Sequence, residues 1–124
     1  MQITIDIEAE EPLFAQLIAG IKAAIGAGSL KAGDALPSIR QLANDLDLNN
    51  KTVAKAYRLL ERDHVIQTKG YRGTFVHPDA KAHVDFDLAA WLEAQLGEII
   101  EACRARGATD SEIRIAFANI MQNK

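Results

Sequence analysis

Four long cationic side chains recur in the middle of the chain at the spacing of one helix face. They are Lys51, Lys55, Arg58 and Arg62, at intervals i, i+4, i+7 and i+11. Side chains at these intervals lie one above another on a helix, so they would form a continuous positive row. Such a row suits the binding of a polyanion, because each side chain offers hydrogen-bond donors to oxygen acceptors. An isolated row of this kind is also typical of a helix face that is merely solvated.

The total charge conceals a basic middle third between two acidic flanks. The 124 residues carry a formal net charge of −3. Residues 37–77 hold seven lysines and arginines against four acids, a local charge of +3, whereas residues 1–36 and 78–124 each sum to −3. The local electrostatic field of a domain decides whether it attracts a polyanion. The positive charge of residues 37–77 therefore indicates that this part of the chain binds one.

The same stretch carries a second, apolar row. Val53, Ala56, Tyr57 and Leu60 follow at i, i+3, i+4 and i+7, so the helix predicted to begin at Asn49 has one face to bury and one to expose. A helix that enters the major groove of DNA needs both faces, because one docks on its own domain while donors on the other reach phosphates and base edges. We expect Tyr57 in the core, with a contact to a base as the alternative.

A shorter helix is predicted directly before this one. Ser38 is a favourable N-cap, and it follows a loop over residues 33–37. The apolar positions that this helix would bury are Ile39, Leu42, Ala43 and Leu46. Two helices in this order form the pattern of a helix-turn-helix, in which the second helix enters the groove.

Two β-prone runs follow the helices, over residues 65–68 and 74–77, separated by Lys69-Gly70-Tyr71-Arg72-Gly73. A glycine-bounded segment between two such runs predicts a β-hairpin. Lys69 and Arg72 at its tip would lie along the minor groove, where glycine lets the main chain approach closely. The sequence therefore predicts a winged helix-turn-helix, with the hairpin as its wing.

The first turn of the predicted recognition helix holds the residues nearest to base edges. They are Asn49, Asn50 and Lys51; lysine favours guanine acceptors and asparagine can pair with adenine. Contacts to the DNA backbone fix the register of such a module. They are expected from Ser38, Arg40, Thr52 and Lys55.

The residues ahead of this module predict an arm and one more helix. Ile3, Ile5 and Ile7 alternate with polar residues, which indicates a short half-buried strand or an extended arm. Pro12 then begins a helix that ends near Gly26. Its apolar residues are Leu13, Leu17, Ile18, Ile21 and Ile25.

The last third predicts a helical tail. One long amphipathic helix runs from Asp87 to about Arg106, and Thr109 with Glu112 forms a capping-box signature for a last helix. Their apolar face is larger than a three-helix module can cover, so we expect a second copy of the chain to bury it. The residues expected at this dimer interface are Leu88, Trp91, Leu92, Leu96, Ile99, Ile100, Phe117 and Ile120.

These elements predict a mainly α (α+β) fold in two parts. Residues 1–78 form a winged helix-turn-helix DNA-binding domain, and residues 79–124 form a helical dimerisation tail. The length leaves no room for a full ligand-binding domain as well. Any effector pocket is therefore expected to be small or absent.

Neither export nor catalysis is indicated. The opening residues lack a signal-peptide layout, no apolar run approaches the roughly 20 residues of a membrane span, and Cys103 is the single cysteine. We expect a soluble cytoplasmic protein without a membrane partner. Cys103 is predicted to be a buried inert thiol, with redox sensing as the alternative. Trp91 is assigned to packing or to the interface, with a ligand cage as the alternative.

The sequence holds no pattern of a catalytic site, neither a glycine-rich phosphate loop nor a nucleophile elbow. His77, His83, Asp85 and Asp87 gather after the predicted wing. Their spacing matches no strong metal-ligand signature. We predict no enzymatic activity, no metal and no cofactor.

The order of these motifs resembles the DNA-binding domain of the GntR family of bacterial transcription regulators. The resemblance rests on Leu36-Pro37-Ser38-Ile39-Arg40-Gln41-Leu42-Ala43, Thr52-Val53-Ala54-Lys55-Ala56-Tyr57 and Gly73-Thr74-Phe75-Val76, and covers roughly residues 8–77. The short tail and the Asn-x-x-Thr-Val-x-Lys-Ala-Tyr form are similar to the YtrA subfamily. His64 occupies a position where the family usually has glycine, so it is expected to accept a turn geometry that glycine favours.

The resemblance implies a dimeric repressor, since YtrA-like members often control operons for ABC-type transporters. We expect a homodimer on a palindromic operator in double-stranded DNA, with an unidentified small-molecule effector left open. A winged helix for architectural DNA binding or protein contact, without operator specificity, is the alternative. The predicted DNA-binding residues are Ser38, Arg40, Asn49, Asn50, Lys51, Thr52, Lys55, Arg58, Lys69, Gly70, Tyr71, Arg72 and Gly73.

Overall fold

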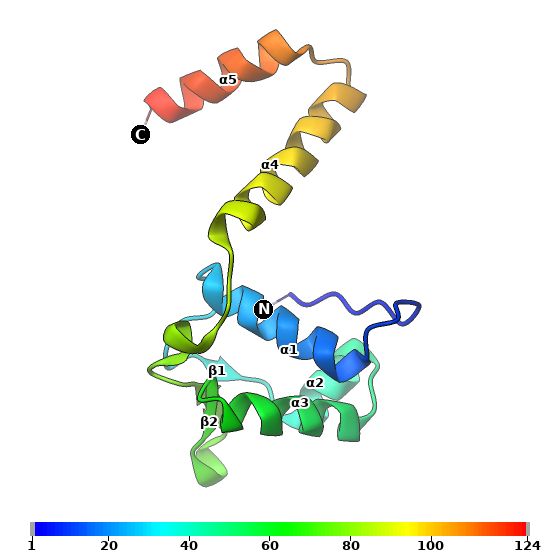
Figure 1. Cartoon of the computed structure of the whole chain (residues 1–124), viewed down its shortest axis with the longest axis vertical. Helices are drawn as coiled ribbons and strands as arrows, with labels where there is room; N and C mark the ends of the chain where they lie inside the picture. The colour runs from blue at the N-terminus through cyan, green and yellow to red at the C-terminus, as the bar shows by residue number, and fades with distance from the viewer. Residues whose placement is uncertain (1, 124) are drawn as a thin grey trace. The chain divides into compact units, whose positions relative to one another are not determined.

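The computed structural model describes residues 2–123, and the chain forms two compact units that divide between Phe86 and Asp87 (Figure 1). The first unit contains α1 (Leu13–Gly26), β1 (Ala35–Leu36), α2 (Ile39–Leu46), α3 (Asn50–Arg62), β2 (Ile66–Thr68), the 3-10 turn η1 (Gly70–Arg72), β3 (Thr74–Val76) and the 3-10 turn η2 (Ala80–His83). The second unit contains α4 (Leu88–Ala105) and α5 (Asp110–Gln122). The predicted fold class, a mainly α winged helix-turn-helix followed by two helices, is confirmed.

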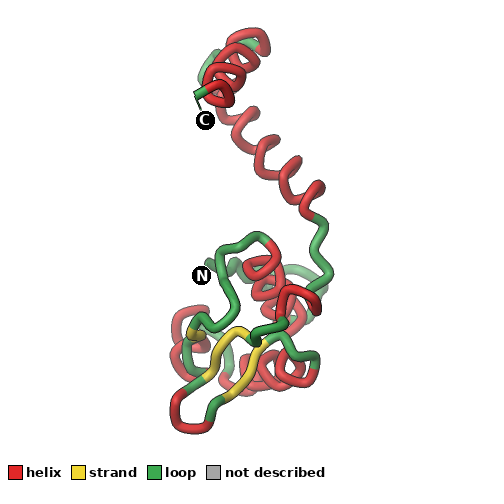
Figure 2. The backbone as a smooth tube through the Cα atoms, turned by 90° about the vertical axis from the view of Figure 1, so that its left-hand side faces the viewer, coloured by secondary structure: helices red, strands yellow, loops and turns green. Residues whose placement is uncertain are grey.

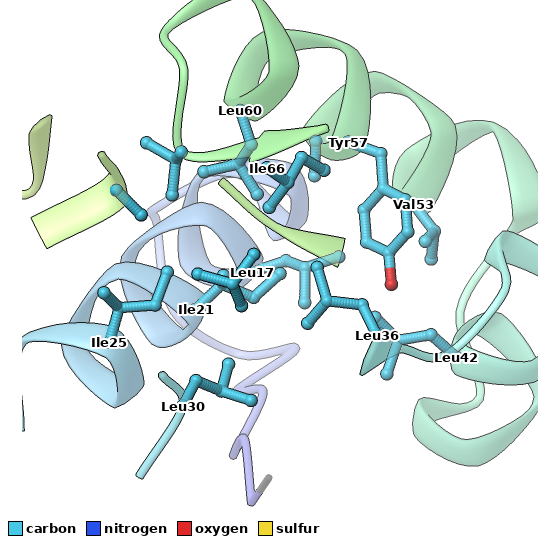
Figure 3. Packing of buried hydrophobic residues seen from close by; sticks show 14 of the residues in the cluster. Leu17, Ile21, Ile25, Leu30, Leu36, Leu42, Val53, Tyr57, Leu60 and Ile66 are labelled. Atoms are coloured by element: carbon cyan, nitrogen blue, oxygen red, sulfur yellow. The ribbon is translucent and has the colours of Figure 1, made fainter. Parts of the chain in front are cut away.

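The core of the first unit lies between α1, α3 and the small sheet (Figure 3). Every element of the unit except η1 contributes a buried side chain. These side chains are Leu17, Ile21, Ile25, Leu30, Leu36, Leu42, Ala43, Val53, Ala56, Tyr57, Leu60, Val65, Ile66, Val76 and Ala80. The apolar row predicted on α3 is therefore buried as expected, and the cationic row on the same helix must face away from the core.

The turn between α2 and α3 is built from local hydrogen bonds. The Ser38 hydroxyl accepts the N–H of Gln41 at 3.1 Å, which confirms Ser38 as the N-cap of α2. At the other end of α2, Asp47 takes a left-handed conformation with φ of 56°. Asn49 then caps α3 by accepting the N–H of Lys51 at 2.7 Å. Asparagine and aspartate tolerate these positions better than most residues, so the sequence places the turn here.

The end of α3 uses a second strained position. His64 has φ of 60°, as expected from its place in a turn where glycine is usual. Its ring stacks on His77 with centroids 5.4 Å apart and meets His83 edge-on at 5.9 Å. The three rings join the end of α3 to β3 and η2. Within residues 2–123, no group of three or more histidine, cysteine or acidic side chains is arranged to hold a metal ion.

The sheet has three strands in the order β1-β3-β2, all antiparallel. The hairpin of β2 and β3 is the predicted wing, with Gln67 opposite Phe75. The third strand, β1, lies within residues 33–37, where the sequence indicated a loop, and that expectation was wrong. Only pairing with distant β3 makes these two residues a strand, since Ala35 lies opposite Phe75, and no local pattern announces such a pairing.

The first unit extends beyond the boundary predicted after residue 78. Ala80, on η2, is buried in the core. The ring of Phe86 lies so close to Gly26 that it leaves no room for a Cβ there. Because both contacts belong to the first unit, the division falls after Phe86.

The arm and α2 differ from expectation at two isoleucines. Residues 2–6 form no strand, and the arm is tied to α1 by Gln16, whose side-chain amide donates to the carbonyl of Asp6 at 3.0 Å. Ile3 and Ile5 pack against the core, but Ile7 is 74% exposed. Ile39 was expected to be buried and is exposed, because it stands in the first turn of α2, where the buried side chains are Leu42 and Ala43.

The second unit consists of two capped helices that lack a core of their own. Thr109 and Glu112 form the predicted capping box of α5, and hydrogen bonds from Thr109 lower the pKa of the Glu112 carboxyl. Arg104 on α4 pairs with Asp110 on α5 at 2.9 Å. No described side chain of α4 or α5 is buried. Cys103, expected to be buried, is half-exposed. Within residues 2–123, no helix combines the length and apolar character needed to cross a membrane.

Tyr57 yields a prediction about stability at high pH. Its hydroxyl donates to the carbonyl of Pro37 at 2.7 Å, and burial raises its pKa to about 12. Because this value lies above the unfolded value of about 10, the contribution is complete below pH of about 10 and is lost as the pH rises toward 12. We expect urea unfolding to show this loss in the unchanged chain and a smaller loss in Tyr57→Phe. At neutral pH, Tyr57→Phe should be less stable by about 1 kcal/mol. Identical pH dependence in both chains would contradict the assignment.

Candidate nucleic-acid interface

The outward face of α3 carries the predicted cationic row. Lys51, Lys55, Arg58 and Arg62 are all exposed, while the apolar row on the opposite face is buried. The helix therefore has the two faces that the sequence indicated. Figure 1 shows α1 running along α3 with the first turns of both helices at the same end.

The four cations have different surroundings. Arg62 is ion-paired with Asp63 at 3.0 Å, and this contact raises the pKa of Arg62 and lowers that of Asp63. The Nζ atom of Lys55 lies 4.0 Å from the centroid of the Phe14 ring on α1. Within residues 2–123, neither Lys51 nor Arg58 forms an ion pair. The charge available to a polyanion is therefore concentrated on Lys51, Lys55 and Arg58.

Two neighbouring asparagines at the N-terminal end of α3, Asn49 and Asn50, have different roles. The side-chain oxygen of Asn49 is engaged by the N–H of Lys51, and its carbonyl accepts the N–H of Thr52 at 3.0 Å. Asn49 therefore acts first as a helix cap, although the sequence had placed it among the base-contacting residues. Asn50 is exposed, and no hydrogen bond engages its side chain in the described part of the chain. Bidentate pairing with a base requires both the amide and the oxygen, and only Asn50 offers both without giving up a cap.

The start of α2 presents one cation and one hydroxyl. Arg40 is exposed one residue into the helix. The Ser38 oxygen accepts the N–H of Gln41, but its own hydrogen can still be donated to a phosphate oxygen. Both residues therefore keep the donors that the sequence assigned to them.

The wing ends in a well-defined turn. The N–H of Lys69 donates to the carbonyl of Gly73 at 2.8 Å, and η1 lies between them (Figure 2). Gly70 and Gly73 have φ of 59° and 110°, which glycine adopts readily. Nothing lies within 4 Å of a Cβ built at either glycine, so the main chain there is open to a ligand. Tyr71, between them, is 98% exposed.

Two contacts of wing residues involve charged side chains, and the sequence predicted neither of them. The Thr68 hydroxyl donates to the Glu61 carboxylate at 2.9 Å, which fastens β2 to α3 and engages the acid that lies among the cations of α3. The Nζ atom of Lys69 lies 5.2 Å from the centroid of the Phe75 ring. Glu61, and Phe14 through its contact with Lys55, therefore belong to this surface. The sequence analysis assigned them no role there, because contacts between residues that are not helical neighbours produce no periodic pattern in the sequence.

The whole surface combines donors from three elements. The first turns of α2 and α3 and the tip of the wing supply exposed lysine, arginine, asparagine and hydroxyl groups, all within residues 37–77. This arrangement matches the chemistry of a duplex, whose phosphates accept from cations and whose base edges accept and donate hydrogen bonds.

Comparison with known proteins finds one matching family model. Residues 13–76 match the model described as "Bacterial regulatory proteins, gntR family". The match begins in the first turn of α1 and ends with β3. It therefore spans the helices and the hairpin that carry the surface described above.

Individual relatives extend the similarity into the tail. The HTH-type transcriptional repressor YtrA of Bacillus subtilis is 37% identical over 98 residues, which are 79% of this chain and 75% of the relative. The HTH-type transcriptional regulator Rv1152 of Mycobacterium tuberculosis is 36% identical over 110 residues, 89% of this chain and 86% of the relative. Among solved structures, YtrA from Sulfolobus acidocaldarius, a GntR-family transcription factor, superposes with a TM-score of 0.58 at 32% identity, covering 80% of this chain and 97% of that chain.

The two asparagines at the start of α3 should differ in their effect on stability. Asn49→Ala removes a cap and is expected to lower the free energy of unfolding by about 1 kcal/mol. Asn50→Ala, at an exposed position without a hydrogen bond, should change it by less than about 0.5 kcal/mol. Chemical unfolding of the two variants measures the difference. Equal losses would show that Asn49 is not the cap that holds the first turn.

Proposed function

The chain belongs to the gntR family of bacterial regulatory proteins, and we propose that it represses transcription as a homodimer bound to a palindromic operator. The family match and two transcription regulators that are 37% and 36% identical establish the general role of the chain. It is a DNA-binding transcription regulator and not an enzyme, as the sequence predicted.

The observation that carries the proposal is the exposed face of α3. It presents Asn50 and Lys51 in the first turn and Arg58 further along, between the capped start of α2 and the wing. In this proposal Asn50 and Lys51 read base edges in the major groove. Backbone phosphates are held by Ser38, Arg40, Thr52, Lys55 and Arg58, and the minor groove receives the wing tip from Lys69 to Gly73.

A second copy of the chain supplies what α4 and α5 lack. Their apolar side chains line an open pocket between the helices with a volume of about 740 Å³. Large apolar residues remain exposed on both, including Ile99 at 59% and Ile120 at 65%. Exposed apolar surface of this kind is typical of subunit interfaces, and a two-fold partner buries it with a self-complementary surface. The proposed interface comprises Leu88, Trp91, Leu92, Leu96, Ile99, Ile100, Phe117 and Ile120.

Dimerisation explains why the operator should be palindromic. Two α3 helices related by a two-fold axis contact two half-sites in inverted orientation. Two linked domains also share the entropy of association, so the pair binds far more tightly than either alone. Occlusion of RNA polymerase at such a site represses transcription, and the site of action is the cytoplasm. A small-molecule effector would act by favouring one separation of the two α3 helices over another.

The resemblance to the YtrA subfamily supports a narrower proposal about the regulated genes. We place a transporter operon under the control of this regulator, because YtrA-like members often control operons of that kind. The relative from Bacillus subtilis is itself named a repressor, which favours repression as the sign of control.

Operator binding is tested by a salt titration on two duplexes, one selected by this chain from a random pool and one of random sequence. The selected duplex should keep an affinity advantage as salt rises, whereas an architectural protein would lose both affinities alike. Asn50→Ala should cost about 1–3 kcal/mol on the selected duplex and narrow the advantage. Lys55→Ala should weaken binding to both duplexes and lower the salt slope by about 0.9, because Lys55 holds a phosphate in this proposal.

Lys81→Ala is the matched control, since it removes the same charge from η2, outside the proposed contact set. It should leave both affinities nearly unchanged. If Lys51→Ala and Lys55→Ala bind the selected duplex as tightly as the unchanged chain, α3 is not the recognition helix.

The dimer is tested on the apolar face of α4. Leu92→Glu combined with Ile99→Glu places two charges at the proposed interface and should produce monomers that bind the selected duplex poorly, because the linked second domain is lost. Light scattering measures the mass, and circular dichroism checks that the helices remain. Ala94→Glu, on the opposite side of α4 by helical spacing, should stay dimeric. A doubly substituted chain of dimeric mass would refute this interface.

A further inference from the structure

The aromatic contact of Lys55 distinguishes it from the other cations of α3. Its Nζ atom lies 4.0 Å from the centroid of the Phe14 ring, a distance at which the ammonium is attracted to the electron-rich ring face. Phe14 is partly buried and packs against the core of the first unit. The ring is therefore a fixed support, and Lys55, though exposed, has a preferred position.

Phe14 and Lys55 line a concave surface between the first turns of α1 and α3. Its lining residues are Leu13, Phe14, Lys51, Thr52 and Lys55. Two lysines and one threonine thus border the apolar side chains of Leu13 and Phe14, and they carry two ammonium groups and one hydroxyl. These are the donors that a phosphate oxygen accepts from.

The main chain of α3 contributes little to this surface. The N–H of Lys51 is taken by the side chain of Asn49, and the N–H groups of Thr52 and Val53 are directed to the Asn49 carbonyl at 3.0 and 3.3 Å. These three N–H groups are engaged within the protein, so an anion beside Thr52 and Lys55 is held by the side chains there. Because a lysine side chain is flexible, the position of its ammonium group in the free protein then affects how tightly the anion is bound.

We propose that Phe14 is a positioning residue for DNA binding: its ring holds the Lys55 ammonium where Thr52 and Lys55 together receive one backbone phosphate. The inference rests on the proposed function and assigns α1 a part in it. A lysine ammonium has three donors, so Lys55 can contact a phosphate oxygen while it remains over the ring. The phosphate is that of a DNA strand, because the same face of α3 is the one that meets the duplex.

The physical benefit lies in the entropy of the lysine side chain. A long side chain that is mobile in the free protein loses rotamer freedom when it is fixed on a ligand. Lys55 has given up part of that freedom before DNA arrives, since the ring already restricts it. The comparable pair in the wing, Lys69 and Phe75, is more distant at 5.2 Å, so we expect the effect to be strongest at Phe14.

The experiment is a double-mutant cycle on the full chain and the selected duplex, with Phe14→Leu, Lys55→Ala and the combination. Phe14→Leu keeps an apolar side chain against the core but removes the ring. It should lower affinity about two- to tenfold for each domain that contacts DNA, the loss expected when one more long side chain must be immobilised on binding. In the Lys55→Ala background the same change should have no effect. Phe14→Tyr retains the ring and should therefore bind DNA as tightly as the unchanged chain.

Unfolding midpoints of all variants separate positioning from folding. Phe14→Met serves as a second ring-free variant if Phe14→Leu is unstable. A loss of affinity with Phe14→Leu that is the same with and without Lys55 would show that Phe14 acts through the fold, and would overturn the inference. So would an unchanged affinity of a folded Phe14→Leu chain.

Failure of the inference can be told apart from failure of the proposed function. If Lys55→Ala leaves affinity unchanged while Asn50→Ala and Lys51→Ala lower it, the recognition helix stands and the phosphate position is wrong. If none of the three variants changes affinity, the function proposed for α3 fails, and the inference falls with it.

Discussion

The structure depends on one constraint: α3 must be buried along one face and remain solvated along the other. Val53, Ala56 and Leu60 are fully buried against α1 and the sheet, and this packing fixes the rotation of the helix about its axis. Because side chains at helical spacing are rigidly related to one another, the same rotation turns Lys51 and Arg58 outward. The core of the first unit therefore determines the direction of the surface proposed to contact DNA.

Secondary contacts then refine that surface. Asn49 closes the first turn of α3, Tyr57 ties the helix to the carbonyl of Pro37, and Glu61 fastens it to the wing through Thr68. Each bond is modest in net free energy. Together they hold the start of α2, the start of α3 and the wing tip in a constant relation, which a rigid duplex requires of its partner.

The second unit differs from the first because its helices are well formed but, within residues 2–123, bury no core. Its helices are well capped, and Arg104 links them through Asp110, yet no described side chain within them is buried. Local interactions can thus specify helices without supplying the apolar burial that stabilises a domain. The proposed dimer resolves this imbalance, because the second copy would provide the missing half of a core. In that proposal, assembly and DNA affinity depend on the same apolar residues.

Features that arise within one helical turn or one period of the residue pattern were predictable from the amino-acid sequence. The caps at Ser38 and Thr109 and both rows on α3 follow from neighbours a few residues apart, so they could be predicted. Three features became evident only in the folded chain: residues 35–36 form a strand, the first unit continues to Phe86, and Lys55 lies over Phe14. These features join segments far apart in the chain, and such contacts depend on packing, which local residue patterns do not encode.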